Sequence, residues 1–231
     1  MQVLKRIFAV LSVLLLCLSV SGEEHPCGSI YYSVNTDGKY VALTFDDGPH
    51  KYRTDEILDI LEENDIKATF FTVGVMAKEY PEIIRRIVSE GHEIGNHTYS
   101  HSKMKRLSPE KLEWEIDETE KILYEICEYR PKLFRPPEGW CSDIVASIAA
   151  ELDYDIILWN IDTLDWAHNS AVNICDSINC EIKPGSIILF HDYVSGKSTT
   201  TEALKSIIPK LKVEGYEFVT VSELINKEKI L

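Results

Sequence analysis

Seven short runs of β-branched and aromatic residues recur along the chain, and longer segments with a helical spacing of apolar residues separate them. The runs span residues 41–45, 68–73, 92–95, 132–134, 156–161, 186–190 and 217–221. Their near-continuous apolarity predicts strands that are buried on both faces, as in a parallel sheet covered by helices. Strands that alternate with helices predict a single α/β domain, either a barrel or a doubly wound sheet.

The segments between the runs have residues typical of helix termini. Thr54 is expected to cap the first helix, Pro81 to occupy the first turn of the second, and Ser108 to open the longest. Gly215 is expected to stop the last one. The predicted helices span residues 54–64, 81–91, 108–128, 142–152, 171–181 and 201–213. No long linker or repeat interrupts this pattern, which indicates one domain.

Five polar clusters lie at or directly after the ends of predicted strands. They are Asp46-Asp47-Gly48-Pro49, His97-Thr98-Tyr99-Ser100-His101, Arg135-Pro136-Pro137-Glu138-Gly139, Asp162-Thr163-Leu164-Asp165-Trp166 and Leu189-Phe190-His191. In α/β barrels, the loops that follow the carboxyl ends of the strands meet at one face, where catalysis takes place. Only ring closure brings all five loops to one mouth, so this placement favours a barrel over an open sheet.

Three side chains of these clusters predict a site for a divalent metal ion. His97 and His101 have a His-x-x-x-His spacing, which places two imidazoles on one metal if the segment turns helically. Asp47 adds a carboxylate, and three protein ligands leave a fourth position for water, as in catalytic zinc sites. Both patterns also have a purely structural reading. The His-x-x-x-His spacing is common in proteins without a metal site, and Asp-Asp-Gly-Pro is typical of a turn.

The other charged residues of the clusters fit acid–base catalysis. Asp46 can reach an attacking water while its neighbour Asp47 binds the metal, and Arg135 can orient Asp46 through charge-assisted hydrogen bonds. Asp165 can raise the pKa of His191, so that an imidazolium is available to protonate a leaving group. The structural alternatives are a surface arginine at position 135 and a polar strand end at position 191.

Three further residues complete the predicted site. The backbone N–H of Glu138 can donate to an oxyanion, a role that does not depend on the side chain. Trp166 and Leu189 can line a small apolar slot, although residues of these types are more often part of a core.

The five clusters, in this order, closely resemble those of the polysaccharide deacetylases, the carbohydrate esterase group with a NodB-type homology domain. The resemblance covers residues 40–224, nearly the whole chain after the first 22 residues. It implies a distorted (β/α) barrel, which agrees with the seven strands predicted above. Many members have an aromatic residue where this chain has Glu138. A glutamate in place of the aromatic residue leaves the backbone N–H of residue 138 able to donate, but it changes the substrate contacts at the rim of the site.

The resemblance also implies a role for each residue of the site. Asp46 is the expected general base, oriented by Arg135, and His191 is the expected general acid, tuned by Asp165. The implied metal ligands are Asp47, His97 and His101. The Glu138 N–H is the implied oxyanion donor, and Trp166 and Leu189 border the pocket for the acetyl methyl group. The expected cofactor is Zn²⁺, with Co²⁺, Ni²⁺ or Mn²⁺ as alternatives.

The expected reaction is hydrolysis of an N-acetyl group on an amino sugar of a polysaccharide, and the expected polysaccharide is peptidoglycan. The alternatives are chitin or another exopolysaccharide as the substrate, and O-acetyl esters, which the same site can hydrolyse. A non-catalytic module that binds wall glycans is the alternative from another class. Such a module has no need for Asp46, Arg135, Asp165 and His191 together.

The N-terminus resembles a secretory signal peptide over residues 1–22. Lys5 and Arg6 precede an apolar run that is shorter than the roughly 20 residues of a membrane span, which disfavours a retained anchor. Residues 23–39 are expected to form an N-terminal extension, and residues 40–226 the catalytic domain. The predicted location is outside the cell or at the cell wall, with an uncleaved anchor as the minor alternative.

Charge and cysteine content limit the expected partners. The formal net charge is −14, and removal of Lys5 and Arg6 brings it to about −16, which argues against nucleic acid and anionic membranes. We expect a monomer. Five cysteines follow the predicted signal peptide, an odd number, and we expect mostly small buried residues with at most one or two disulfides. These are Cys27, Cys127, Cys141, Cys175 and Cys180, and their pairing is left open.

Overall fold

The computed structural model describes residues 28–229, so the predicted signal peptide and Cys27 lie outside the described part of the chain. Its nine strands form one sheet in which every strand pairing is parallel. The strands are β1 (Ile30–Tyr31), β2 (Tyr40–Asp46), β3 (Thr69–Thr72), β4 (Glu93–Asn96), β5 (Leu133–Phe134), β6 (Asp155–Ile157), β7 (Ile161–Asp162), β8 (Ser186–His191) and β9 (Glu217–Phe218).

The sheet curls into a distorted barrel, as expected. Its strand order is β1-β6-β5-β4-β3-β2-β8-β7, and β9 pairs with the start of β2. Only residues 158–160 separate β6 from β7, although these strands lie near opposite ends of that order. Leu158 N donates to Tyr31 O at 2.7 Å, and Asn160 N donates to Ile187 O at 3.2 Å. The chain therefore bridges the two edges of the sheet at this crossing.

The predicted count of seven strands was too low. The run at residues 156–161 was expected to be one strand, but it is interrupted at the crossing and supplies both β6 and β7. The two-residue strand β1 pairs with β6 and is too short to show a period in the sequence. The last strand, β9, ends at Phe218 because the next residues begin a capped helix.

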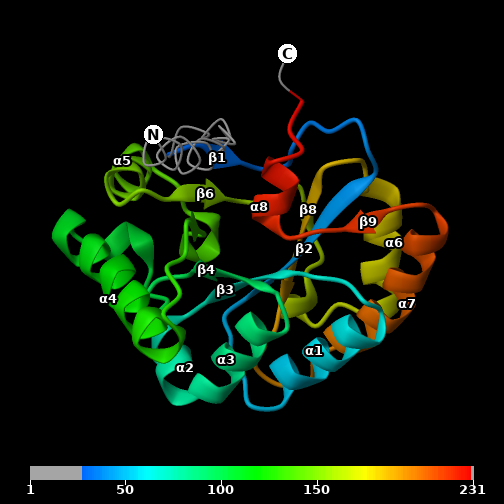
Figure 1. Ribbon diagram of the computed structural model, residues 1–231, viewed down its shortest axis with the longest axis horizontal. Helices are drawn as coiled ribbons and strands as arrows, with labels where there is room; N and C mark the ends of the chain where they lie inside the picture. The colour runs from blue at the N-terminus through cyan, green and yellow to red at the C-terminus, as the bar shows by residue number, and fades with distance from the viewer. Residues whose placement is uncertain (1–27, 230–231) are drawn as a thin grey trace, which may run out of the picture.

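All six predicted helices are present, and the helices surround the sheet (Figure 1). They are α1 (Arg53–Glu63), α2 (Gly74–Glu79), α3 (Pro81–Ser89), α4 (Pro109–Cys127), α5 (Asp143–Glu151), α6 (Ala171–Glu181), α7 (Thr200–Val213) and α8 (Val221–Ile225). The short helices α2 and α8 were not predicted. A capping box between Thr220 and Glu223 begins α8, and this Thr-x-x-Glu pattern in the sequence could have predicted the start of the helix.

Thr54 does not cap α1, contrary to the prediction. The helix begins at Arg53 with Tyr52 as its N-cap, and Thr54 lies fully buried in the first turn. Its hydroxyl accepts a hydrogen bond from His50 N and donates one to Asp192 Oδ2, each at 2.7 Å. Thr54 thus connects two of the loops that follow strands. Pro81 and Ser108 do open α3 and α4 as predicted.

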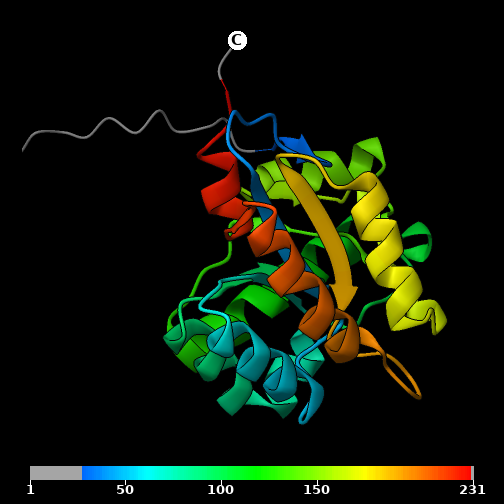
Figure 2. The same ribbon diagram turned by 90° about the vertical axis from the view of Figure 1, so that its right-hand side faces the viewer.

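Alternation along the central strands explains why polar groups reach the barrel interior. In β2, Val41, Leu43 and Phe45 pack in the core cluster that includes the outer helices. Successive side chains of a strand point to opposite faces, so Thr44 and Asp46 face inwards. The neighbouring strand β8, flanked by α6 and α7 in Figure 2, alternates in the same way. Its last residue, His191, pairs in register with Asp46.

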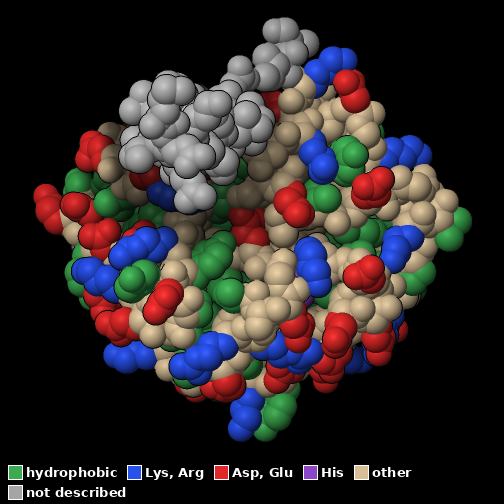
Figure 3. All heavy atoms as spheres, in the orientation of Figure 1, with side chains coloured by type: hydrophobic (Ala, Val, Ile, Leu, Met, Phe, Trp, Pro, Cys, Tyr) green, Lys and Arg blue, Asp and Glu red, His purple; other side chains and the backbone are tan. Residues whose placement is uncertain are grey.

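Charged side chains of both signs are interspersed over the face of the molecule shown in Figure 3. Within residues 28–229, no helix is both long and apolar enough to cross a lipid bilayer. Four cysteines lie in this range and are unpaired: Cys127, Cys141, Cys175 and Cys180. Cys180 is exposed and the other three are half-buried, so these residues are more accessible than predicted.

Candidate active site

A buried ion pair between Asp46 and Arg135 lies in the interior of the barrel, at the carboxyl ends of β2 and β5. Arg135 is fully buried and donates through Nη1 to Asp46 Oδ1 at 2.7 Å and to Thr44 Oγ1 at 2.8 Å. Its Nε and Nη2 donate to the carbonyl oxygens of Ile157 and Leu158. Burial lowers the pKa of Arg135, and the Asp46 carboxylate opposes this shift. Arg135 therefore fixes the carboxylate in one orientation.

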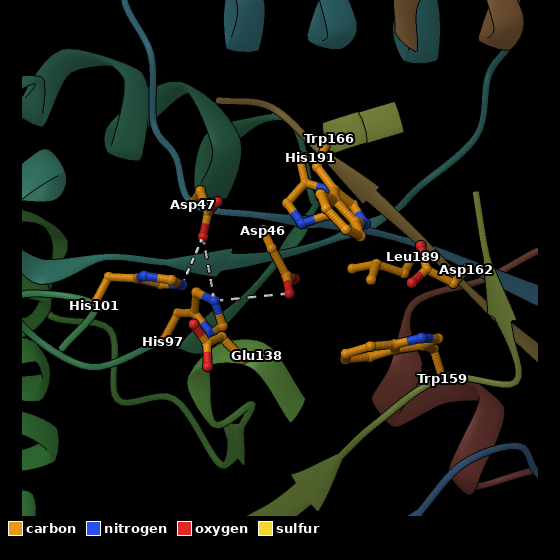
Figure 4. Close-up of a pocket in the computed structure, with 10 residues that line it drawn as sticks. All are labelled: Asp46, Asp47, His97, His101, Glu138, Trp159, Asp162, Trp166, Leu189 and His191. Carbon is orange, nitrogen blue, oxygen red and sulfur yellow. Dashed lines mark ion pairs between the residues drawn. The ribbon is translucent and has the colours of Figure 1, made fainter. Parts of the chain in front are cut away.

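Asp47, His97 and His101 point towards one another beside this pair (Figure 4). His101 Nε2 lies 3.1 Å and His97 Nε2 lies 3.4 Å from Asp47 Oδ1. Candidate ligand atoms of all three residues lie within 4.8 Å of one another. The structure therefore brings together the three residues predicted as metal ligands.

The donor set fits a divalent metal ion on two further observations. Asp47 Oδ1 is buried and accepts no hydrogen bond, an arrangement that is unfavourable unless a ligand satisfies the oxygen. His97 Nδ1 lies 2.6 Å from Arg135 O. Donation from Nδ1 to this carbonyl leaves a lone pair on Nε2, which is the nitrogen that faces Asp47. One imidazole is thus held in the tautomer that can bind a metal.

The segment between the two histidines is a bend rather than the helical turn on which the spacing argument depended. Thr98 and His101 have φ values of 66° and 51°, which turn the backbone sharply enough for both rings to converge. Asp47 has a φ of 76° and Glu138 a φ of 58°. Left-handed conformations at residues other than glycine store about 1–3 kcal/mol each and concentrate at functional sites. Four of them occur in this one site.

A buried carboxylate on α4 supports the bend that carries His101. Glu115 is 1% exposed and accepts hydrogen bonds at 2.8 Å from both the backbone N–H and the hydroxyl of Ser100. Sequence reasoning did not find Glu115, because one glutamate in an amphipathic helix is normally a solvated residue. Its contacts place it as a positioning residue for the metal-binding loop.

We expect Glu115→Gln to weaken divalent metal binding by about tenfold, because an amide cannot accept both Ser100 hydrogen bonds as strongly as a carboxylate does. Titration of the metal-free protein with Zn²⁺ or Co²⁺ measures this effect. Glu113→Gln makes the same chemical change at an exposed position of α4 and is the matched control. Equal affinities of the two variants would show that the Ser100 anchor is unimportant for the site.

His191 and Asp165 form the second predicted pair. His191 Nδ1 lies 2.8 Å from Asp165 Oδ1, and Asp165 Oδ2 accepts hydrogen bonds from His191 N and from Thr200 Oγ1. Burial lowers the pKa of His191, but the hydrogen bond and negative charge of Asp165 outweigh burial and raise it to about 9. This shift favours the imidazolium near neutral pH, and Nε2 is the nitrogen left to donate.

Asp46, His191 and the cluster of Asp47, His97 and His101 all line one pocket of about 420 Å³ (Figure 4). The predicted rim residues Glu138, Trp166 and Leu189 all line it. Two residues that were not predicted, Trp159 and Asp162, line it as well. Asp162 belongs to a cluster that the sequence singled out, whereas Trp159 lies in the crossing at residues 158–160, which was expected to be strand. The structure thus joins all five loops in one cavity.

A buried carboxylate held by arginine, a candidate metal site and a His–Asp pair are the groups that metal-assisted hydrolysis requires. Comparison with known proteins agrees. The family model described as polysaccharide deacetylase matches residues 33–157. A peptidoglycan-N-acetylglucosamine deacetylase of Bacillus cereus is 40% identical over 205 residues, which cover 88% of this chain and 96% of the relative.

Two further matches agree with this one. The peptidoglycan-N-acetylmuramic acid deacetylase PdaC of Bacillus subtilis is 38% identical over 85% of this chain and 41% of its own length. A crystal structure of a peptidoglycan N-acetylglucosamine deacetylase superimposes with a TM-score of 0.83 at 38% identity, covering 88% of this chain and 96% of that one. The chain belongs to the polysaccharide deacetylase family, as its sequence clusters indicated. The family is named for the removal of acetyl groups from polysaccharides, and both relatives named above are deacetylases.

Proposed function

We propose that the protein is a metal-dependent N-deacetylase of peptidoglycan that acts outside the cell. The observation that carries the proposal is the convergence of Asp46, the Asp47-His97-His101 cluster and His191 on one pocket. The relatives named above act on peptidoglycan, which supports this glycan over chitin or another exopolysaccharide. O-acetyl ester hydrolysis by the same groups is the second candidate.

Asp47, His97 and His101 would hold the metal ion, and Zn²⁺ suits this mixture of imidazole and carboxylate ligands. Co²⁺, Ni²⁺ and Mn²⁺ are alternatives. When bound, the ion supplies Lewis acidity, which polarises a carbonyl oxygen and makes water a stronger nucleophile at neutral pH. These ligands line a pocket of about 420 Å³.

The chain's own residues then move the protons. Asp46 Oδ2 lies free of the arginine, which binds Oδ1, and it accepts a proton from the attacking water. The backbone N–H of Glu138 stabilises the oxyanion of the tetrahedral adduct. His191 donates its proton to the departing nitrogen, and the Asp165 carboxylate stabilises the imidazolium. Leu189 and Trp166 border the space for the acetyl methyl group. The products are acetate and a free amino sugar.

Secretion and oligomeric state belong to the same proposal. The sequence of residues 1–22 supports export by a signal peptide, with a retained anchor as the minor alternative, and we propose a monomer at or near the cell wall. A wall-binding module without activity is the alternative from another class. The intact Asp46–Arg135 and His191–Asp165 pairs favour the enzyme, since glycan binding alone does not require them.

The test is acetate release by the purified, metal-loaded protein from peptidoglycan, chitooligosaccharides and acetylated xylan. We expect release from peptidoglycan and little from the ester substrate. Release from chitin alone would exclude peptidoglycan as the substrate. Release of acetate mainly from xylan would favour the esterase, and no release from any glycan would contradict the enzymatic proposal.

The His191–Asp165 pair predicts the pH dependence of the reaction. His191 acts as an acid only while protonated, so activity is lost as the pH rises through its folded pKa. That pKa is about 9 in the protein alone, and a nearby divalent cation lowers it. We therefore expect the alkaline limb of kcat/KM to lie above about pH 6.5, the ordinary histidine value, and below about pH 9.

Asp165→Asn should move this alkaline limb towards about pH 6.5, because the amide removes the negative charge that raises the pKa of His191. A profile of kcat/KM between pH 5 and 10 measures the shift. The same pair stabilises the fold below the unfolded pKa of histidine, and this contribution disappears as the pH rises through the folded value. An unchanged limb in Asp165→Asn would assign it to another group.

A further inference from the structure

A second cleft lies where the first turns of α4 and α5 come together, and the proposed deacetylation does not use it. Its volume is about 360 Å³, and it shares no lining residue with the active pocket. Met104, Leu112 and Val145 line it and belong to one buried core cluster, so the cleft has an apolar floor. The two helices contact each other at the left of Figure 1, and their N-cap residues, Ser108 and Ser142, also line the cleft.

Trp140 connects this cleft to the active pocket. It lines the cleft and is 38% exposed, whereas Glu138, two residues earlier, lines the active pocket. The turn between them is well held. Trp140 N donates to Pro137 O at 3.1 Å, and Gly139 packs so closely on Trp159 that a Cβ there would lie 2.8 Å from the indole. Two residues span at most about 7 Å, so a sugar bound in the active pocket can place a substituent in the cleft.

Lys105 gives the cleft a positive charge. Its Nζ lies 4.0 Å from the centroid of the Trp140 ring, which holds the ammonium at the wall of the cleft. Within residues 28–229 it forms no salt bridge, and no other charged residue lines the cleft. Glu110 and Asp143, in the first turns of the two helices, do not line it, and His191 and the candidate metal ligands line the active pocket instead. A ligand in the cleft therefore meets an apolar floor, an indole ring and one cation.

We infer that the cleft binds the short acidic peptide carried by the muramic acid sugars of peptidoglycan, and so favours strands that bear peptides over peptide-free strands. This inference rests on the proposed function and adds a part of the substrate that deacetylation does not touch. The peptide begins on a lactyl ether, so it lies on the reacting sugar or on the next one. Its alanine methyl groups suit the apolar floor and Trp140, and a carboxylate suits Lys105 through a charge-assisted hydrogen bond.

Three tetrasaccharides of alternating N-acetylglucosamine and N-acetylmuramic acid test the inference. The first carries the dipeptide L-alanyl-D-glutamate on each muramic acid, the second carries the same dipeptide with its carboxylates amidated, and the third has free lactyl groups. We expect kcat/KM to be about tenfold higher for the first than for the third, the effect of one hydrogen bond between charged groups, and intermediate for the second. Titration calorimetry with the metal-free protein should give the same order of affinities, independently of catalysis.

Variants of the cleft separate its effect from the overall charge of the substrate. Lys105→Gln should remove the advantage of the acidic dipeptide over the amidated one, and Trp140→Leu should reduce the advantage of both over the peptide-free strand. Lys183→Gln removes the same charge at an exposed position before the amino end of β8 and should leave these ratios unchanged. Equal binding of all three strands, or native ratios in both cleft variants, would overturn the inference. Preferential binding of the acidic strand without acetate release from any strand would instead contradict the proposed function.

Discussion

Asp46→Asn lowers kcat by about 10²–10⁴-fold and leaves metal binding intact. General base catalysis typically contributes a factor of this size, and an amide cannot accept the proton of the attacking water. Metal binding should be unaffected, because the candidate ligands are Asp47, His97 and His101 and Asp46 is not one of them. Acetate release under substrate saturation measures kcat, and metal content after dialysis measures binding.

The matched control for this variant is Asp176→Asn, which makes the same change at an exposed position of α6. We expect its kcat to equal that of the native protein. If Asp46→Asn retained activity within about threefold of the control, Asp46 would not be the base. If the variant lost its metal as well as its activity, Asp46 would be a ligand, and the assignment of the two adjacent aspartates would be reversed.

Arg135→Met destabilises the protein by about 3–5 kcal/mol, the effect of leaving one charge of a buried pair without its partner. The substitution removes all four hydrogen bonds of the guanidinium, including the one to Asp46. For a domain of this size the loss corresponds to a Tm that is lower by roughly 6–20 °C. Chemical denaturation gives the free energy of unfolding, and activity should fall as well because Asp46 is no longer oriented.

Two controls show whether the unpaired charge causes the loss. Arg130→Met removes an exposed arginine that pairs with Glu120, and it should change stability by no more than about 1 kcal/mol. The double variant Asp46→Leu with Arg135→Met buries neither charge and should be more stable than Arg135→Met alone. A double variant that is less stable than the single one would mean that packing, not charge, governs this position.

Much of the fold could be predicted from the sequence because most of the strands are continuous apolar runs. Runs such as 41–45 and 186–190 are buried on both faces, so they are apolar throughout and predict β2 and β8 correctly. The crossing at residues 158–160 could not be predicted, because Leu158 and Trp159 continue the apolar run. Only long-range hydrogen bonds to Tyr31 and Ile187 separate β6 from β7 there.

The site was predictable in composition and less so in geometry. Polar residues at strand ends have to meet in a barrel, so the positions of Asp46, Arg135 and His191 followed from the strands. The convergence of His97 and His101 depends on left-handed conformations at Thr98 and His101, which local propensity disfavours. Tertiary contacts such as those of Glu115 hold this backbone in place, and they join residues that are far apart in the sequence.

Acetate release from peptidoglycan, with and without bound metal, tests most directly whether the five loops form one deacetylase site. Metal-loaded protein should release acetate and expose free amines in equal amounts. Removal of the metal by a chelator should abolish both, and Zn²⁺ or Co²⁺ should restore them. His97→Ala, which removes one ligand, should stay inactive after the metal is added back. Full activity of the metal-free protein, or of His97→Ala, would contradict the account.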